Sequence, residues 1–163
     1  MHSGHFSLAL IALLASPKVL SATHCTPVEI NYFTCNVKGS DKLVSVCGNQ
    51  FRSHDNPDGQ INDDAWLQYR FGRPGQVELI YPAAKTPLVK KFSGEYILAN
   101  DIRLYSLTFF NHGFSYEIEF VHDWNIRVKE KGRSTALTCE GRPTTQFADN
   151  LNNVFELVRN LAF

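Results

Sequence analysis

Short segments in which apolar and polar residues alternate, separated by turn-forming residues, constrain this chain more than any other feature. In Trp66 to Tyr81, WLQYRFGRPGQVELIY, the apolar Leu67, Tyr69 and Phe71 alternate with polar residues. This period of two is typical of a half-buried β-strand, because successive side chains point to opposite faces of a sheet. Similar segments occur at 30–47, 102–123, 126–131 and 133–139. We therefore expect an all-β fold, an antiparallel meander of about eight strands that forms a barrel or a sandwich.

The quoted segment also predicts a register for its hairpin. If Phe71 lies opposite Val77, the apolar side chains of both strands share one face. Arg70 then lies opposite Glu78, and we expect a cross-strand ion pair worth about 0.5 kcal/mol. Arg70 would accordingly be part of the scaffold.

The turn of this hairpin leaves a second arginine to explain. An L-Pro-Gly pair prefers type I or II turns, whose twist does not fit a two-residue hairpin loop. Pro74-Gly75 should therefore lie in a loop of about five residues, from Gly72 to Gln76. Arg73 would project from that stiffened loop without an obvious partner.

Two further elements follow from turn chemistry and helical spacing. Asn111-His112-Gly113 predicts a three-residue turn, with Phe110 opposite Phe114 in a third hairpin. Apolar residues recur at steps of three and four in TTQFADNLNNVFELVRNLAF, which predicts an amphipathic C-terminal helix over residues 145–161. A helix with one apolar face in an all-β protein is expected to buttress the sheet.

The N-terminal residues have the character of a secretory signal. Phe6 to Ser16 is an apolar run too short to span a bilayer, and small residues suited to signal peptidase follow it. We interpret residues 1–22 as a signal peptide cleaved after Ala22, with cleavage after Ala15 and an N-terminal strand of a cytosolic protein as the alternatives. Residues 23–163 would then form a single β-rich domain, periplasmic or secreted, without a membrane anchor.

An even number of cysteines in an exported chain favours disulfides. In a hairpin about Gly39-Ser40, Cys35 and Cys47 point to opposite faces and should not bond to each other unless a bulge intervenes. Each would then bond to Cys25 or Cys139, and we take Cys25–Cys47 and Cys35–Cys139 as the working pairing. The cysteines lack the spacing of a zinc site.

Charge and motifs exclude several classes of function. The 16 basic and 16 acidic residues of the chain become 15 and 16 once residues 1–22, which hold Lys18 and no acid, are removed. A nearly neutral chain is not expected to bind nucleic acid, which needs clustered Lys and Arg. The polar run 52–64 resembles a calcium loop only in its middle, because His54 and Ala65 stand where the first and last carboxylates should be. We predict no cofactor and no metal.

No catalytic constellation stands out either. No nucleophile elbow, zinc-protease motif or phosphate loop occurs. The remaining candidates for acid–base chemistry are His122 with Asp101 or Glu119, and Glu117 and Glu119 are expected on an outward face. We therefore expect a protein that is not an enzyme and has no catalytic residues.

The order of several motifs resembles a family of small exported all-β proteins of Gram-negative bacteria of uncharacterised function. The shared motifs are FTCNVKGSDKLVSVC, the LQYRFGR hairpin, FSG, the GFSY strand and the final LTC, across residues 32 to 139. The chain departs from that pattern at EYILANDIRLYS, which replaces a glycine-rich run, and after Tyr116, where it is acidic and shorter. The resemblance implies export and a β fold rather than an activity.

These features favour binding to another protein. By analogy with periplasmic lysozyme inhibitors and with immunity proteins, a loop carrying Arg73 could engage the catalytic carboxylates of an envelope-targeting enzyme. His112 and Trp124, at other predicted turns, are further contact candidates. The alternatives are a small-ligand-binding β-barrel and a hydrolase. Nothing in the sequence predicts the oligomeric state.

Overall fold

The computed structural model describes residues 22–51, 62–88, 90–99, 102–120 and 123–144. These residues contain nine strands and no helix. The strands are β1 Ile30–Asn36, β2 Leu43–Gly48, β3 Leu67–Arg73, β4 Gln76–Tyr81, β5 Ser93–Ala99, β6 Ile102–Asn111, β7 Phe114–Phe120, β8 Trp124–Glu130 and β9 Arg133–Thr138.

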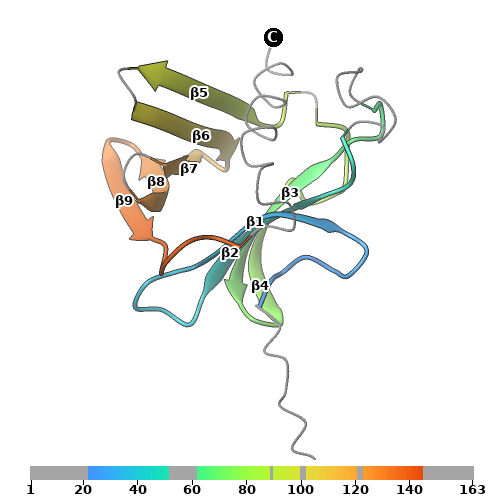
Figure 1. Cartoon of the computed structure of the whole chain (residues 1–163), viewed down its shortest axis with the longest axis horizontal. Helices are drawn as coiled ribbons and strands as arrows, with labels where there is room; N and C mark the ends of the chain where they lie inside the picture. Colours follow the sequence, from blue (N-terminus) through green and yellow to red (C-terminus); the bar gives the residue numbers. More distant parts are fainter. Residues whose placement is uncertain (1–21, 52–61, 89, 100–101, 121–122, 145–163) are drawn as a thin grey trace, which may run out of the picture.

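The all-β prediction is confirmed, and the strands form two antiparallel sheets rather than a closed barrel (Figure 1). One sheet has the order β1-β2-β3-β4 and the other the order β5-β6-β7-β8-β9. The strand β5 is additional to the eight that the sequence predicts. Residues 1–21 of the predicted signal peptide, the run 52–61 and the predicted helix over 145–161 lie outside the described residues.

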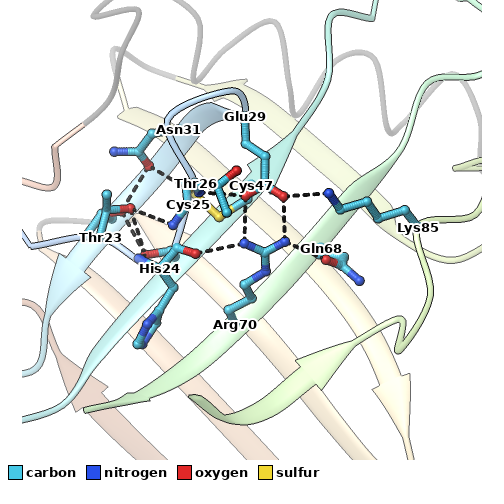
Figure 2. The surroundings of a disulfide bond; sticks show 12 residues. Thr23, His24, Cys25, Thr26, Glu29, Asn31, Cys47, Gln68, Arg70 and Lys85 are labelled. Atoms are coloured by element: carbon cyan, nitrogen blue, oxygen red, sulfur yellow. Dashed lines mark hydrogen bonds and ion pairs between the residues drawn. A yellow bond between two sulfur atoms is a disulfide. The ribbon is translucent and has the colours of Figure 1, made fainter. Parts of the chain in front are cut away.

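The hydrophobic core lies between the two sheets. The strands of the second sheet run across those of the first, behind them in the view of Figure 2. Phe109 of β6 packs on Tyr69 of β3 and Tyr81 of β4, with ring centroids 4.9 and 4.4 Å apart. Phe33 of β1 contacts Trp124 at the start of β8, at 5.3 Å. Aromatic rings thus join the two sheets. A small-ligand-binding barrel would need an open interior, and this packing does not support that alternative.

The β6–β7 hairpin corrects the predicted register by one residue. Asn111 lies opposite Phe114, so the loop holds only His112 and Gly113. Both loop residues have positive φ, 48° and 85°, as the type I′ turn of a two-residue hairpin requires. The expected three-residue turn was wrong because His112, a non-glycine residue, adopts the left-handed conformation as well as Gly113.

This register decides which side chains of the hairpin are buried. Leu107 lies opposite Ile118, and both face the core. Glu117 lies opposite Thr108 and Glu119 opposite Ser106, on the outer face. The glutamates are therefore outward-facing as predicted.

Both disulfides of the working pairing are present in the structure. Cys25 bonds to Cys47, and Cys35 bonds to Cys139. The first ties the chain before β1 to β2. The second ties β1 to the segment after β9, where Val37 also bridges Cys139 and Thr34 bridges Thr144. One edge of the four-stranded sheet is thereby joined to the end of the five-stranded sheet.

The two disulfides are expected to differ in their contribution to stability. They close loops with sequence separations of 22 and 104 residues. If each acts by restricting the unfolded chain, removing them should lower the free energy of unfolding by about 3 and about 5 kcal/mol, respectively. Denaturant unfolding of the Cys25→Ser/Cys47→Ser and Cys35→Ser/Cys139→Ser variants measures both. A larger loss in the first variant would contradict the loop-length explanation.

Candidate functional site

The turn of the β3–β4 hairpin is tighter than predicted. Arg73 lies opposite Gln76, so Pro74-Gly75 is a two-residue loop rather than part of a five-residue one. Gly75 has φ of 77°, the positive value that the residue after proline needs in a type II turn. The chain therefore uses the combination that the twist of a regular hairpin disfavours.

A β-bulge next to this turn accommodates the mismatch. Phe71 lies opposite Leu79 and Gly72 opposite Val77, which leaves Glu78 as an extra residue on β4. A bulge of this kind increases the local twist, which the L-Pro-Gly turn does not supply. The predicted register was wrong for this reason.

The bulge places four charges together at the ends of two hairpins. We call these residues the hairpin-tip cluster: Asp41, Lys42, Arg73 and Glu78. Arg73 Nε donates to Asp41 Oδ2 at 2.6 Å, and Arg73 Nη1 lies 3.7 Å from Glu78 Oε1. Lys42 Nζ donates to Glu78 Oε2 at 2.6 Å. Charges of opposite sign alternate through the cluster, so the expectation that Arg73 lacks a partner was wrong.

The hairpin-tip cluster remains open to solvent. The side chains of Arg73 and Asp41 are 50% and 65% exposed. Their hydrogen bond lowers the pKa of the Asp41 carboxyl and raises that of the Arg73 guanidinium, so both groups stay charged. Among the described residues, the ion pairs of Arg73 use Nε and Nη1. Nη2 is left for a further acceptor.

Arg70, three residues earlier, lies in a second polar network that is buried (Figure 2). Its two terminal nitrogens donate to the two carboxylate oxygens of Glu29, at 2.7 and 2.8 Å. The same nitrogens donate to the His24 carbonyl oxygen and to Gln68 Oε1, each at 2.7 Å. The predicted pair with Glu78 was wrong, since the bulge places Ile80 opposite Arg70.

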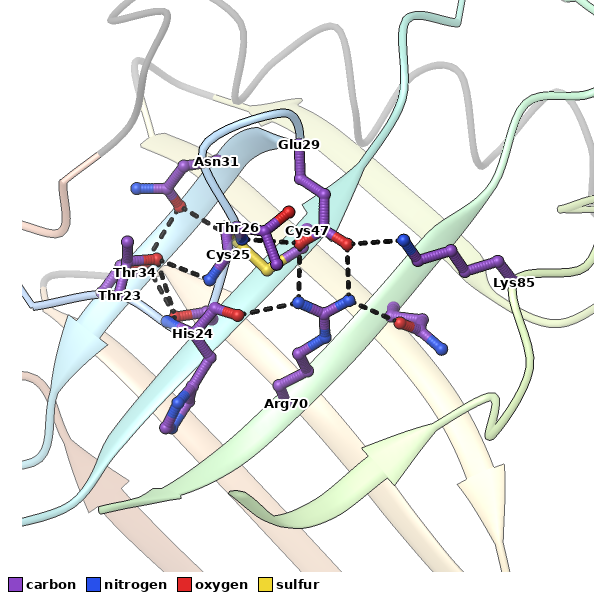
Figure 3. A network of polar contacts seen from close by, with 12 residues as sticks. Thr23, His24, Cys25, Thr26, Glu29, Asn31, Thr34, Cys47, Arg70 and Lys85 are labelled. Carbon is purple, nitrogen blue, oxygen red and sulfur yellow. Dashed lines mark hydrogen bonds and ion pairs between the residues drawn. A yellow bond between two sulfur atoms is a disulfide. The ribbon is translucent and has the colours of Figure 1, made fainter. Parts of the chain in front are cut away.

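Residues 23–29, which we call the N-terminal strap, bring Glu29 and His24 to this network. Figure 3 shows the strap on the side of the four-stranded sheet that faces away from the second sheet. Disulfide Cys25–Cys47 fixes its middle. The His24 backbone N–H donates to Ser45 Oγ at 3.0 Å, and Lys85 Nζ lies 2.8 Å from Glu29 Oε1. The strap is thus held by β2, by β3 and by the connection that follows β4.

Burial and hydrogen bonding act in opposite directions on the two titratable groups of the strap. Burial raises the pKa of Glu29, but hydrogen bonds from Arg70, Lys85 and the Thr26 backbone outweigh it and lower the value to about 2. Burial lowers the pKa of His24. His24 Nε2 lies 3.2 Å from the Gly72 carbonyl oxygen, so its neutral ring carries the proton on that nitrogen. Glu29 is charged and His24 neutral near pH 7.

The other two predicted contact residues do not join Arg73. His112 lies in the exposed β6–β7 turn, and Trp124 begins β8, just beyond the other end of β7. The length of β7 therefore separates them. Trp124 is partly buried against Phe33, as a residue that closes the end of the core would be.

The acidic candidates for catalysis are engaged in ion pairs. Glu119 binds Arg127, and Glu117 Oε2 accepts from Lys129 Nζ at 2.9 Å. His122 and Asp101 lie outside the described residues. Within the described ranges, no group of three His, Cys, Asp or Glu residues could hold a metal ion. Nor does this part of the chain contain a helix long and apolar enough to cross a membrane.

Comparison with known proteins identifies no relative: no protein family matches the chain, and neither a curated protein nor a solved structure is detectably similar to it.

Neither alternation nor turn residues predict the N-terminal strap and its partners. Glu29 is 41 residues from Arg70, beyond the reach of cross-strand reasoning. One signal was present in the sequence: Ser45, Gln68 and Arg70 occupy the polar positions of two strands that lie in the middle of the sheet. Such a polar surface, when buried, needs partners from another segment.

Gly72 should be required for the bulge that forms the hairpin-tip cluster. It has φ of 153°, and a Cβ there would meet the Gln76 carbonyl oxygen and, at 2.8 Å, the Glu78 backbone nitrogen. Gly72→Ala should therefore lower the free energy of unfolding by more than about 1 kcal/mol. Gly75→Ala is the control, because Gly75 also has positive φ but open space around it. Equal losses in chemical denaturation would contradict the steric explanation.

The strap should make stability depend on pH. Because the pKa of Glu29 is lowered from 4.5 to about 2, its contribution is present above pH 4.5 and is lost as pH falls toward 2. That loss amounts to about 3 kcal/mol. The lowered pKa of His24 affects stability in the same direction. The stability that His24 contributes begins to be lost as pH falls below about 6.5.

Urea unfolding between pH 2 and pH 7 measures this dependence. The variant Glu29→Leu/Arg70→Met replaces the whole pair with apolar residues, which avoids an unpaired buried charge. It should reduce the slope below pH 4.5, leaving the part that belongs to the lowered pKa of Asp41, and keep the slope that belongs to His24. An unchanged slope below pH 4.5 would rule out Glu29 as its source.

Proposed function

We propose that this chain is an exported protein-binding protein, of the inhibitor or immunity type, that neutralises an enzyme directed at the cell envelope. The observation that carries the proposal is the exposed hairpin-tip cluster, which presents Arg73 where the ends of the β1–β2 and β3–β4 hairpins meet. A guanidinium in such a position can bind a carboxylate through charge-assisted hydrogen bonds. Enzymes that cleave cell-wall glycans commonly act through a pair of carboxylates in a cleft.

The contacts of Arg73 reduce what binding costs. Asp41 and Glu78 restrict the long side chain before a partner arrives, so less rotamer entropy remains to be lost. Pro74 restricts the backbone on one side and the bulge on the other. A projecting hairpin end of this kind fits into a concave site better than a flat sheet face does.

The disulfides bear on the compartment in which this protein is found. Two disulfides are compatible with an oxidising extracytoplasmic environment, because reducing systems keep cytosolic thiols free. The apolar run at residues 6–16 supports the narrower proposal, which is periplasmic or secreted location after cleavage of residues 1–22. An inhibitor or immunity protein would meet its target there.

Affinity capture tests the proposal. Immobilised chain is exposed to periplasmic extract, the bound proteins are identified by mass spectrometry, and each is assayed for hydrolysis of purified cell wall with and without the chain. We expect an envelope-targeting hydrolase whose activity the chain reduces. If the chain binds only proteins without such activity, or leaves the captured hydrolase fully active, the proposed function is wrong.

Variants of the hairpin-tip cluster then locate the contact. Arg73→Glu should weaken binding of that hydrolase at least tenfold, because two carboxylates would repel each other where an ion pair formed. Asp41→Asn should preserve or strengthen binding, since the Asn side-chain oxygen can still accept from Arg73 Nε and restrain the side chain, while the competing negative charge is removed. Isothermal titration measures each dissociation constant.

The matched control is Lys91→Glu, which reverses one exposed charge in the connection between β4 and β5 instead. It should leave binding of the hydrolase unchanged. Circular dichroism checks that each variant is folded. Full affinity in Arg73→Glu would remove Arg73 from the interface, whatever partner is found.

A further inference from the structure

We propose that the outer edge of β9 binds an extended, acidic segment of a partner protein as an additional strand. This edge belongs to the five-stranded sheet, whereas the hairpin-tip cluster belongs to the other sheet. The inference therefore does not depend on the proposed function.

The edges of the two sheets differ in how they are protected. The β1 edge is bridged by residues 139–144, and the β4 edge carries the bulged residue Glu78. Both devices hinder the addition of a strand. By contrast, β5 and β9 pair with their neighbours without any bulge. A regular edge is a template for strand addition.

The turn that precedes β9 determines which backbone groups point outward. Lys131 and Gly132 have φ of 43° and 82°, and Glu130 lies opposite Arg133. In a two-residue hairpin of this type, the closing pair exchanges both of its backbone hydrogen bonds. Bonds to β8 then fall on every second residue of β9.

Ser134, Ala136 and Thr138 are the alternate residues, whose N–H and C=O groups point away from β8. One contact supports this assignment, since the Thr138 carbonyl oxygen accepts from Lys38 N at 2.9 Å. No described residue bonds to the outward groups of Ser134 and Ala136. The edge thus offers two donors and two acceptors in the spacing of a β-strand.

The side chains along β9 set the chemistry of the partner. Arg133 to Ala136 are exposed. The four residues from Ser134 to Leu137 carry no charge, so nothing there repels an incoming strand in the way that edge lysines do. Backbone bonds would supply affinity, and the residues flanking the edge would supply selectivity.

Those flanking residues are basic. Residues 124–138 have a net charge of +3, from four basic residues and one acidic residue, Glu130, in a chain that is neutral overall. The basic residues are Arg127, Lys129, Lys131 and Arg133. Glu119 and Glu117 pair with the first two, whereas no ion pair holds Lys131 or Arg133 among the described residues. The strand β5 carries Glu95 and no basic residue. Charge complementarity therefore selects β9 over β5, and an acidic strand over a neutral or basic one.

Nuclear magnetic resonance of the ¹⁵N-labelled chain tests the proposal with two defined probes. One is a capped peptide of three Glu-Val repeats, and the other is a capped peptide of three Lys-Val repeats. We expect the Glu-Val peptide to shift the backbone amide signals of Ser134 and Ala136 and to slow their hydrogen exchange. The Lys-Val peptide should bind at least tenfold more weakly. Shifts confined to other strands, or equal binding of both peptides, would overturn the proposal.

Two variants separate the backbone contribution from the charge. Ala136→Pro removes an outward N–H without removing a bond to β8, and proline is tolerated at such edge positions. It should weaken binding of the Glu-Val peptide at least tenfold, whereas Ala136→Val should leave binding unchanged. Lys131→Glu/Arg133→Glu should reverse the preference between the two peptides, and this variant keeps the ladder intact if the proline variant fails to fold.

A second copy of the chain is the rival occupant of this edge. Sedimentation of the peptide-free chain over a range of concentrations distinguishes the two. A monomer that binds the Glu-Val peptide at β9 supports the proposal. A dimer that the Ala136→Pro change disrupts would show that β9 pairs with itself, and would overturn it.

Discussion

The ion pair between Arg70 and Glu29 is the contact on which the arrangement of this protein depends. It joins a central strand of the four-stranded sheet to a segment that precedes the first strand. Either charge would be costly to bury alone. Glu29 also accepts from the Thr26 backbone and pairs with Lys85, and Arg70 also donates to the His24 carbonyl oxygen, so both buried charges have partners. The bidentate geometry also fixes the position of the strap, because a guanidinium binds a carboxylate in one plane.

The four-stranded sheet is consequently covered on both faces at its central strands β2 and β3, whereas β4 stays largely exposed. Its apolar face packs on the second sheet, and its polar face lies beneath the N-terminal strap, which is why every residue of β2 is buried. A disulfide holds each of the two covering parts in place. Cys25–Cys47 joins the strap to β2, and Cys35–Cys139 joins the segment after β9 to β1. A sheet with this many polar side chains on one face would otherwise present that face to water. The disulfides therefore stabilise the same two interfaces that the ion pair and the aromatic core define.

Much of this fold could be predicted from the sequence, because alternation and turn residues are local signals. The strands around 30–47 and 66–81 follow from them, and the disulfide pairing agrees with the faces that alternation assigns to Cys35 and Cys47. The errors lie where backbone conformation outweighs the pattern. The register near Pro74-Gly75 depends on a bulge, and the one near His112 on a left-handed non-glycine residue, neither of which the hydrophobic pattern encodes. The partner of Arg70 lies far away in sequence, so strand pairing could not predict it. The strand β5 was not predicted because Tyr96-Ile97-Leu98 is a continuous apolar run without alternation.

The different surroundings of Arg70 and Arg73 also indicate where a partner could bind. The bulge lies between them in the ladder, so Arg70 is kept under the strap while Arg73 reaches the exposed end of the hairpin. With both faces covered over β2 and β3, a partner can reach this sheet at its turns and along β4, but not at the centre of a face. The β4 edge is interrupted by Glu78, which is itself engaged by Lys42 and Arg73. The turn that carries Arg73 is therefore the part of this sheet where charge, exposure and a restrained backbone occur together, and an arginine three residues earlier could not serve the same purpose.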